Sequence, residues 1–172
     1  HVSESDKPHN IVLEGWKPPE RIEREWAEAQ EMTRNCNQPG RFVTFPGYEW
    51  QGDGTSGDHN VFALTEGMPV FRVDKIAELY ERLREWDAIA IPHHVAYRPG
   101  VRGRDWSVFD EDMSPFCEVY SVHGCSETDE EWIGLRRNSH MGPGYGAGTW
   151  QAALDRGLPV GAICSNDNWG GT

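Results

Sequence analysis

The stretch of sequence that decides the fold is DKIAELYERLREWDAIAIPHH, residues 74–94. Its first half predicts an amphipathic helix that begins at Asp74, because apolar side chains recur at helical spacing on one face. This apolar stripe consists of Ile76, Leu79, Tyr80, Leu83 and Trp86. The second half predicts a short buried strand over residues 88–91, which ends near two adjacent histidines, His93 and His94. A helix followed at once by a strand with polar side chains at its end is typical of an α/β fold.

The alternation of strand and helix continues in both directions from this stretch. Further strands are predicted over residues 41–45, 60–64, 116–122 and 159–164. Further helices are predicted over residues 18–31, 126–137 and 149–156. Five strands separated mainly by helices predict βα units, and therefore a parallel sheet or barrel in a single domain spanning residues 1–172.

The excess of acidic residues restricts the classes of molecule that the chain is expected to bind. Its 172 residues include 28 Asp and Glu against 16 Lys and Arg, a formal net charge of −12. Nucleic acids and anionic membranes bind clustered basic residues, so neither is expected as a partner. The longest apolar run, residues 88–91, is far shorter than the roughly 20 residues of a membrane-spanning helix. Bound divalent cations would offset the acidic charge and allow the protein to bind a small phosphoester.

Side chains with metal-binding chemistry gather at the ends of the predicted strands. These strand-end residues are Glu49, His93, His94, His123 and Asp167. Parallel α/β folds place reactive groups at the carboxyl ends of their strands, so we expect these side chains to meet. Imidazole and carboxylate together suit Zn, Mn or Fe. Two such ions held about 3.5 to 4 Å apart would activate a bridging water for hydrolysis of a phosphate ester.

Each of these residues also has an ordinary structural interpretation. A single histidine is about as often a hydrogen-bonded loop or core residue as a ligand, and a single carboxylate is more often a cap or turn residue. Their joint placement at strand ends is what favours a metal site. The four cysteines lack the spacing of a zinc or redox motif and are expected to be free thiols.

Five stretches of the chain carry a further pattern. They are FVTFPGYEW at 42–50, GDHNV at 57–61, IPHH at 91–94, EVYS at 118–121 with GCSE at 124–127, and AICSNDN at 162–168. Together these motifs resemble the domain-of-unknown-function family 3604, within the PHP (polymerase and histidinol phosphatase) superfamily. The resemblance covers nearly the whole chain.

The resemblance implies a distorted (β/α)7-type barrel with up to three metal ions at its mouth and a metal-activated water that attacks a phosphoester. Glu49 and Asp167 would be catalytic, and Glu49 would bridge two ions. The metal ligands implied by the resemblance are His1, Glu49, His59, His93, His94 and Asp167. Residues that would orient a ligand or replace one are Glu118, His123 and Asn168.

Two departures from the family pattern reduce this expectation. The opening His-x-His strand is missing, so a partial barrel is expected, and Trp169 occupies the position of the closing histidine. We therefore expect one or two ions rather than three, and weak or undetectable phosphatase activity from the isolated chain. Because the chain begins with His1, a fragment of a longer protein is the simplest account of the missing strand. Two functions remain open: a metal-dependent phosphoesterase, or a non-catalytic ligand-binding module with an incomplete metal site.

The adjacent histidines are predicted to differ in orientation. Successive strand residues face opposite sides, so extended backbone past Pro92 would direct only one of the His93 and His94 rings into the mouth of the barrel. The sequence leaves the substrate, the native metal, the localisation and the oligomeric state open.

Overall fold

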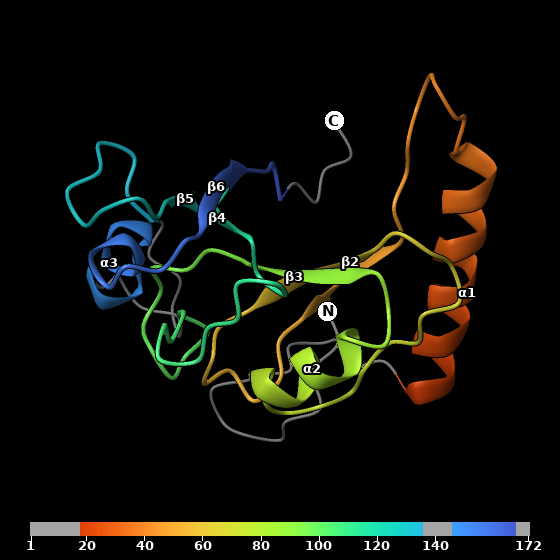
Figure 1. The fold of residues 1–172 in the computed structure, drawn as a ribbon, viewed down its shortest axis with the longest axis horizontal. Helices are drawn as coiled ribbons and strands as arrows, with labels where there is room; N and C mark the ends of the chain where they lie inside the picture. The colour runs from red at the N-terminus through yellow and green to blue at the C-terminus, as the bar shows by residue number, and fades with distance from the viewer. Residues whose placement is uncertain (1–17, 136–145, 168–172) are drawn as a thin grey trace.

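The computed structural model describes residues 18–135 and 146–167, which fold into two small sheets and three α-helices (Figure 1). The first half of the chain contributes α1 (Pro19–Cys36), β1 (Gly47–Trp50), β2 (His59–Ala63), α2 (Ile76–Leu83) and β3 (Ala88–Pro92). The second half contributes β4 (Phe116–Ser121), β5 (Gly124–Cys125), the 3-10 helix η1 (Gly146–Gly148), α3 (Trp150–Asp155) and β6 (Gly161–Cys164). Each half therefore supplies one sheet.

The first sheet is antiparallel, with the strand order β1-β2-β3. One face is apolar, because alternate residues of β2 point to the same side and His59, Val61 and Ala63 are buried there. The predicted stripe of α2 contributes to the same core, in which Ile76, Leu79, Tyr80 and Leu83 are buried. At one end, Trp26 of α1 enters this core and its Nε1 donates to the Met68 carbonyl at 2.6 Å.

The connection between β2 and β3 explains why these strands run antiparallel although a helix lies between them. Residues 64–74 lead back along the sheet, since Phe71 N donates to the Tyr48 hydroxyl at 3.1 Å and Trp50 Nε1 donates to the Val73 carbonyl at 2.9 Å. Helix α2 then returns the chain to the end from which it left. As a result β3 begins beside the end of β2, with Ala88 opposite Ala63.

The second sheet has the strand order β5-β4-β6, with β5 antiparallel and β6 parallel to β4. The crossover from β4 to β6 contains α3, whose predicted start is confirmed: the Thr149 hydroxyl accepts from Ala152 N at 3.2 Å. A second core lies under this crossover, and its buried members are Val95, Trp106, Cys117, Val119, Ala153 and Val160.

The predicted barrel is wrong. The mixed α/β composition is confirmed, but the described residues form two separate three-stranded sheets that do not close into a (β/α)7 barrel, partial or complete. Only β4 and β6 form a parallel pair among the named strands. The out-and-back connection over residues 64–87 replaces the single crossover that a βα unit requires.

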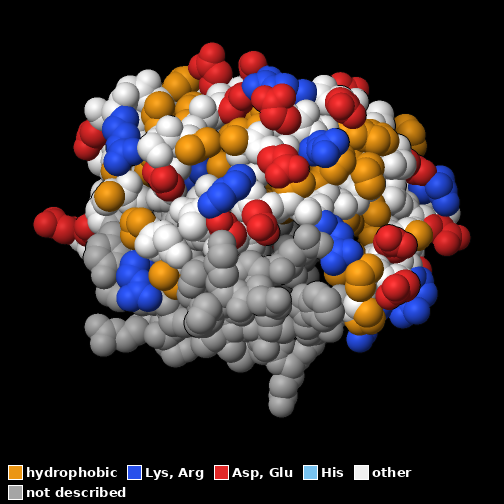
Figure 2. Space-filling view, turned by 90° about the horizontal axis from the view of Figure 1, so that it is seen from below, with side chains coloured by type: hydrophobic (Ala, Val, Ile, Leu, Met, Phe, Trp, Pro, Cys, Tyr) orange, Lys and Arg blue, Asp and Glu red, His pale blue; other side chains and the backbone are white. Residues whose placement is uncertain are grey.

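Several element boundaries also differ from the prediction. Residues 41–45 form no strand apart from an isolated bridge between Gln38 and Phe42, and β1 begins at Gly47. Residues 126–135 contain no helix, and the end of that predicted helix lies outside the described residues. No helix in the described part is long and apolar enough to cross a membrane. Figure 2 shows acidic and basic side chains interspersed with apolar ones on one face of the molecule.

Candidate metal centre

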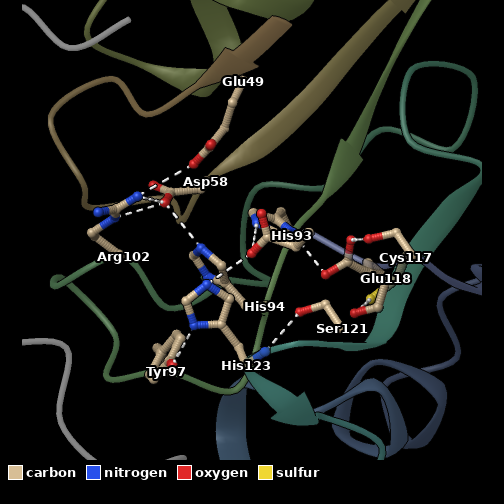
Figure 3. Close-up of polar contacts among 12 residues, drawn as sticks. Glu49, Asp58, His93, His94, Tyr97, Arg102, Cys117, Glu118, Ser121 and His123 are labelled. Atoms are coloured by element: carbon tan, nitrogen blue, oxygen red, sulfur yellow. Dashed lines mark hydrogen bonds and ion pairs between the residues drawn. The ribbon is translucent and has the colours of Figure 1, made fainter. Parts of the chain in front are cut away.

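Histidine and carboxylate side chains from both sheets converge between them (Figure 3). The first sheet and its flanking loops supply Glu49, Asp58, His93 and His94, and the second supplies Glu118, His123 and Asp167. The end of β3 lies against β4, which brings the two sets together. Residues within the strands and in the segments that follow them therefore bring these side chains together even though the sheets form no barrel.

His93 is held between two carboxylates. Its Nδ1 donates to Glu118 Oε1 at 2.7 Å, and its Nε2 lies 3.4 Å from Asp167 Oδ2. Glu118 is itself buried and accepts a hydrogen bond from the Ser165 hydroxyl. Burial lowers the pKa of His93, but the hydrogen bonds to Asp167 and Glu118 outweigh it and raise the pKa to about 10. This carboxylate–histidine pair directs Nε2 toward Asp167, as outer carboxylates do for metal-ligating histidines.

Asp167 Oδ2 also lies 2.8 Å from His123 Nε2. The other ring nitrogen of His123, Nδ1, lies 2.8 Å from the hydroxyl of the buried Tyr97. This contact fixes the orientation of the His123 ring, as Glu118 does for His93. Two ligands about 2.1 Å from a zinc ion are about 3.4 Å apart in tetrahedral geometry. The His93–Asp167 separation of 3.4 Å matches that spacing, whereas the His123–Asp167 separation of 2.8 Å is that of a hydrogen bond. We name His93, His123 and Asp167 the histidine centre.

A second group lies beside the first and consists of Glu49, Asp58 and His94, whose ligand atoms lie within 4.8 Å of one another. We name it the acidic triad. His94 Nε2 lies 3.2 Å from Asp58 Oδ2. Burial, the charge of His93 and the charge of Arg102 hold the pKa of His94 well below its usual range, so the ring is neutral and offers a lone pair. His94 also forms a group with His93 and His123, whose ligand atoms lie within 4.8 Å of one another, so it is shared between the two regions.

Arg102 occupies the acidic triad. Its Nε donates to Asp58 Oδ2 at 2.6 Å, its Nη2 donates to the same oxygen, and Nη2 lies 3.3 Å from Glu49 Oε1. Burial lowers the pKa of Arg102, but the Asp58 carboxylate outweighs it and raises the pKa above its usual value. Arg104 holds the loop that carries Asp58, because its Nη1 donates to the Ser56 carbonyl at 3.1 Å.

Backbone strain is concentrated at this site. Among the described residues, the three non-glycine residues with positive φ are His94 at 32°, Arg102 at 70° and Asp167 at 45°. Residues other than glycine are strained when φ is positive, and strained residues tend to cluster at functional sites. All three belong to the histidine centre or the acidic triad, or contact them.

The turned backbone at His94 contradicts the expected opposite orientation of the two histidines. The ring centroids of His93 and His94 are 4.0 Å apart, so both rings lie on the same side of the chain. They nevertheless have different partners, because His93 contacts Glu118 and Asp167 whereas His94 contacts Asp58.

His59 lies outside both groups. It is fully buried, and its ring packs edge-on against Trp50 and Tyr80 in the first core. The β1–β2 register pairs Glu49 with Asn60, so alternation puts Asp58 on the face of Glu49 and His59 on the opposite face. Burial and the nearby Arg104 charge hold the pKa of His59 well below its usual range. The ligand role of His59 stays a prediction.

Three residues of the site were not assigned roles from the sequence: Asp58, Tyr97 and Arg102. Asp58 stands in a predicted ligand segment, and the strand alternation just described would have selected it over its neighbour. No spacing signal marks Tyr97 or Arg102, because loop packing brings them to the site. Three predicted positions, His1, Asn168 and Trp169, lie outside the described residues.

The donor set is that of a candidate transition-metal centre, since imidazole nitrogen combined with carboxylate oxygen suits Zn, Mn and Fe. Comparisons with protein-family models, with curated proteins and with solved structures find no match to this chain. The function must therefore be inferred from the residues and geometry of the site.

Proposed function

We propose that this protein is a metal-dependent hydrolase of phosphoesters, with a divalent Zn, Mn or Fe ion held by His93, His123 and Asp167. The observation that carries the proposal is the Glu118–His93 pair, which is buried and directs His93 Nε2 toward an oxygen shared with His123. With its pKa raised to about 10, His93 is protonated between the two carboxylates, so a bound divalent cation would take the place of the Nε2 proton.

Unpaired buried atoms support the fit of a cation to this region. His94 Nδ1 and Asp58 Oδ1 are buried and have no hydrogen-bond partner among the described residues. An unpaired buried polar atom costs about 1–3 kcal/mol. Both atoms belong to residues of the acidic triad, and His94 also borders the histidine centre. The donors therefore suit a cation rather than an apolar ligand.

The side chains have separate roles in the proposed reaction. When bound, a divalent cation supplies a coordinated water of lowered pKa and polarises a phosphoryl oxygen. Glu49 accepts the proton that the attacking water loses; its charge already acts on His93 and Asp167. The Arg102 guanidinium supplies a fixed positive charge for phosphoryl oxygens, which arginine binds well.

The substrate class rests on the resemblance to family 3604 and on Arg102. Asp58 and Arg102 add a carboxylate and a guanidinium to the resemblance-derived ligands, and both suit an ion-assisted phosphoester site. The acidic net charge of −12 is consistent with phosphate binding through a metal ion rather than through a basic surface.

Metal content and phosphatase activity together test the proposal. The chain is loaded with Zn²⁺ or Mn²⁺, dialysed, and assayed by elemental analysis and by hydrolysis of p-nitrophenyl phosphate. We expect bound metal and weak, chelator-sensitive turnover, both reduced in Asp167→Asn. Asparagine tolerates positive φ, so this change leaves the backbone at position 167 unstrained. The exposed Glu130→Gln variant is the matched control, and equal metal content in the two variants would contradict the proposal.

A second candidate function is a non-catalytic ligand-binding module. The contact of Arg102 with Asp58 and Glu49 favours it, because these carboxylates are already engaged by a cation of the chain itself. Stable metal binding without turnover of mono- or diesters would support this second function over the first.

A further inference from the structure

Arg102 is anchored by its backbone as well as by its side chain. Its N–H donates to the Gly54 carbonyl at 3.0 Å, and the guanidinium contacts two members of the acidic triad, Asp58 and Glu49. The side chain of Arg102 is only 16% exposed, and that of Asp58 is fully buried. The guanidinium is therefore held where the donor atoms of the triad converge.

The two groups differ in the kind of charge that they contain. Arginine stays protonated in proteins, so its positive charge leaves the triad only if the whole side chain moves. Moving it would break the contacts to Asp58 and Glu49 and would leave these carboxylates without their cation. In the histidine centre, His93 forms its ion pairs with Glu118 and Asp167, and Asp167 forms its ion pairs with His93 and His123. The positive charge in these pairs is carried by imidazole, which can lose its proton when a cation binds, and not by a guanidinium.

We propose that Arg102 closes the acidic triad to a second divalent cation, so that the chain holds one ion at the histidine centre and carries a guanidinium in the second cation position. This inference rests on the proposed function, since it assumes an ion at the histidine centre. The acidic triad is then a latent metal site, because Asp58 Oδ1 and His94 Nδ1 are both buried without a hydrogen-bond partner among the described residues. Positive charge beside the reacting phosphoryl group comes from the protein instead of from a second ion.

Counting bound Mn²⁺ in charge-removing variants tests the closure. Equilibrium dialysis measures the number of ions per chain, and electron paramagnetic resonance distinguishes an isolated Mn²⁺ from two neighbouring ions. The test variant is Arg102→Gly, because glycine adopts the positive φ of this position freely. Arg102→Lys retains the charge, and Arg34→Met removes an arginine that pairs with Glu66 far from the site. Arg102→Gln replaces the glycine variant if circular dichroism shows that the latter does not fold.

We expect one Mn²⁺ in the wild-type chain, in Arg102→Lys and in Arg34→Met, and two coupled ions in Arg102→Gly. Adding Asp58→Asn to Arg102→Gly should return the count to one. A single ion in Arg102→Gly, or two ions in the wild type, overturns the closure.

Other outcomes separate this inference from the proposed function. If neither wild type nor Arg102→Gly binds Mn²⁺, the histidine centre is overturned and the closure with it. If the ion counts are as expected but no phosphoester is hydrolysed, the closure stands and the proposed hydrolase activity is overturned.

Discussion

At the scale of single residues, Glu118 determines which nitrogen of His93 faces Asp167. Removing its charge while keeping its shape, as in Glu118→Gln, leaves the ring free to turn and weakens the donor. Loss of such an outer carboxylate costs roughly 10- to 100-fold in metal affinity. We expect the dissociation constant for Zn²⁺, measured by competition with a chromophoric chelator, to rise by that factor.

The matched control for this prediction is Glu111→Gln, a change of the same type at an exposed position. It should leave the affinity for Zn²⁺ unchanged. If Glu118→Gln binds Zn²⁺ as tightly as the control, the orienting role of Glu118 is wrong.

Asp53 is a buried carboxylate outside the site, and it gives a prediction about pH. Burial raises its pKa, but the ion pair with Lys75 and hydrogen bonds from Thr55 hold the pKa well below its usual range. The folded-state pKa is thus below the unfolded value of about 3.9. The stabilisation is therefore present above about pH 4 and is lost as the pH falls toward the folded-state pKa.

We expect Asp53→Asn to lower the free energy of unfolding by about 1–2 kcal/mol at pH 7. The difference from wild type should shrink below pH 4, as measured by urea denaturation across this range. Asp74→Asn, at an exposed position beside the same lysine, should show little change at either pH. A loss of unfolding free energy in Asp53→Asn that does not change with pH would contradict the stabilising role of the ionised Asp53 carboxylate.

At the scale of elements, the loop between β3 and β4 carries both Tyr97 and Arg102, and its turn depends on Gly103. A Cβ at Gly103 would lie 1.9 Å from the Tyr97 carbonyl oxygen, so alanine cannot fit unless the backbone shifts. Gly100, in the same loop, has positive φ of 76° but no heavy atom within 4 Å of its Cβ position.

We expect Gly103→Ala to destabilise the protein by more than Gly100→Ala, whose cost should be about 1–2 kcal/mol. Gly103→Ala should also weaken Zn²⁺ binding, because Tyr97 positions His123. Thermal denaturation and metal titration measure the two effects. Equal stability in both variants would show that the loop relaxes around the new side chain.

Individual elements were predictable where a local pattern was strong. The apolar stripe of α2 from Ile76 to Leu83, the apolar run of β3 and the helix α3 all occur where the sequence placed them, within a few residues. Residues 41–45 were misassigned because their apolar side chains carry β propensity. In the described part of the chain, Phe42, Val43 and Phe45 are exposed and pair with no strand. Local propensity does not reveal whether a partner strand is present.

At the scale of the whole molecule, the relative direction of the strands could not be predicted from the sequence. A helix between two strands usually means a parallel crossover. Here residues 64–74 have no helical or strand pattern of their own, yet they run along the full first sheet and reverse the expected direction of β3.

The candidate site was more predictable than the fold that holds it. Glu49, His93, His94, His123 and Asp167 lie in the same region, as expected. The two adjacent histidines, His123 and Asp167 follow strands, whereas Glu49 lies within β1. Asp58, Tyr97 and Arg102 were missed since their positions depend on register and loop packing, which are set by tertiary contacts.

The histidine centre combines side chains from both sheets, and if these side chains bind a metal ion as proposed, this has a kinetic consequence. His93 ends the first sheet, whereas His123 and Asp167 follow strands of the second, so the three donors come together only after the sheets have docked. Such long-range contacts tend to form late in folding. A ligand bound only after the transition state slows unfolding and leaves the folding rate unchanged.

At a Zn²⁺ concentration 100 times its dissociation constant, binding adds about 2.7 kcal/mol of stability. Stopped-flow measurements in denaturant should then show unfolding slowed roughly 100-fold, with an unaltered refolding limb. His123→Ala should unfold at the same rate with and without Zn²⁺. Accelerated refolding in Zn²⁺ would instead mean that the ion is captured by the unfolded chain and draws the two sheets together early. If only unfolding is slowed, the bound ion prolongs the lifetime of the native state and does not change how fast the chain folds.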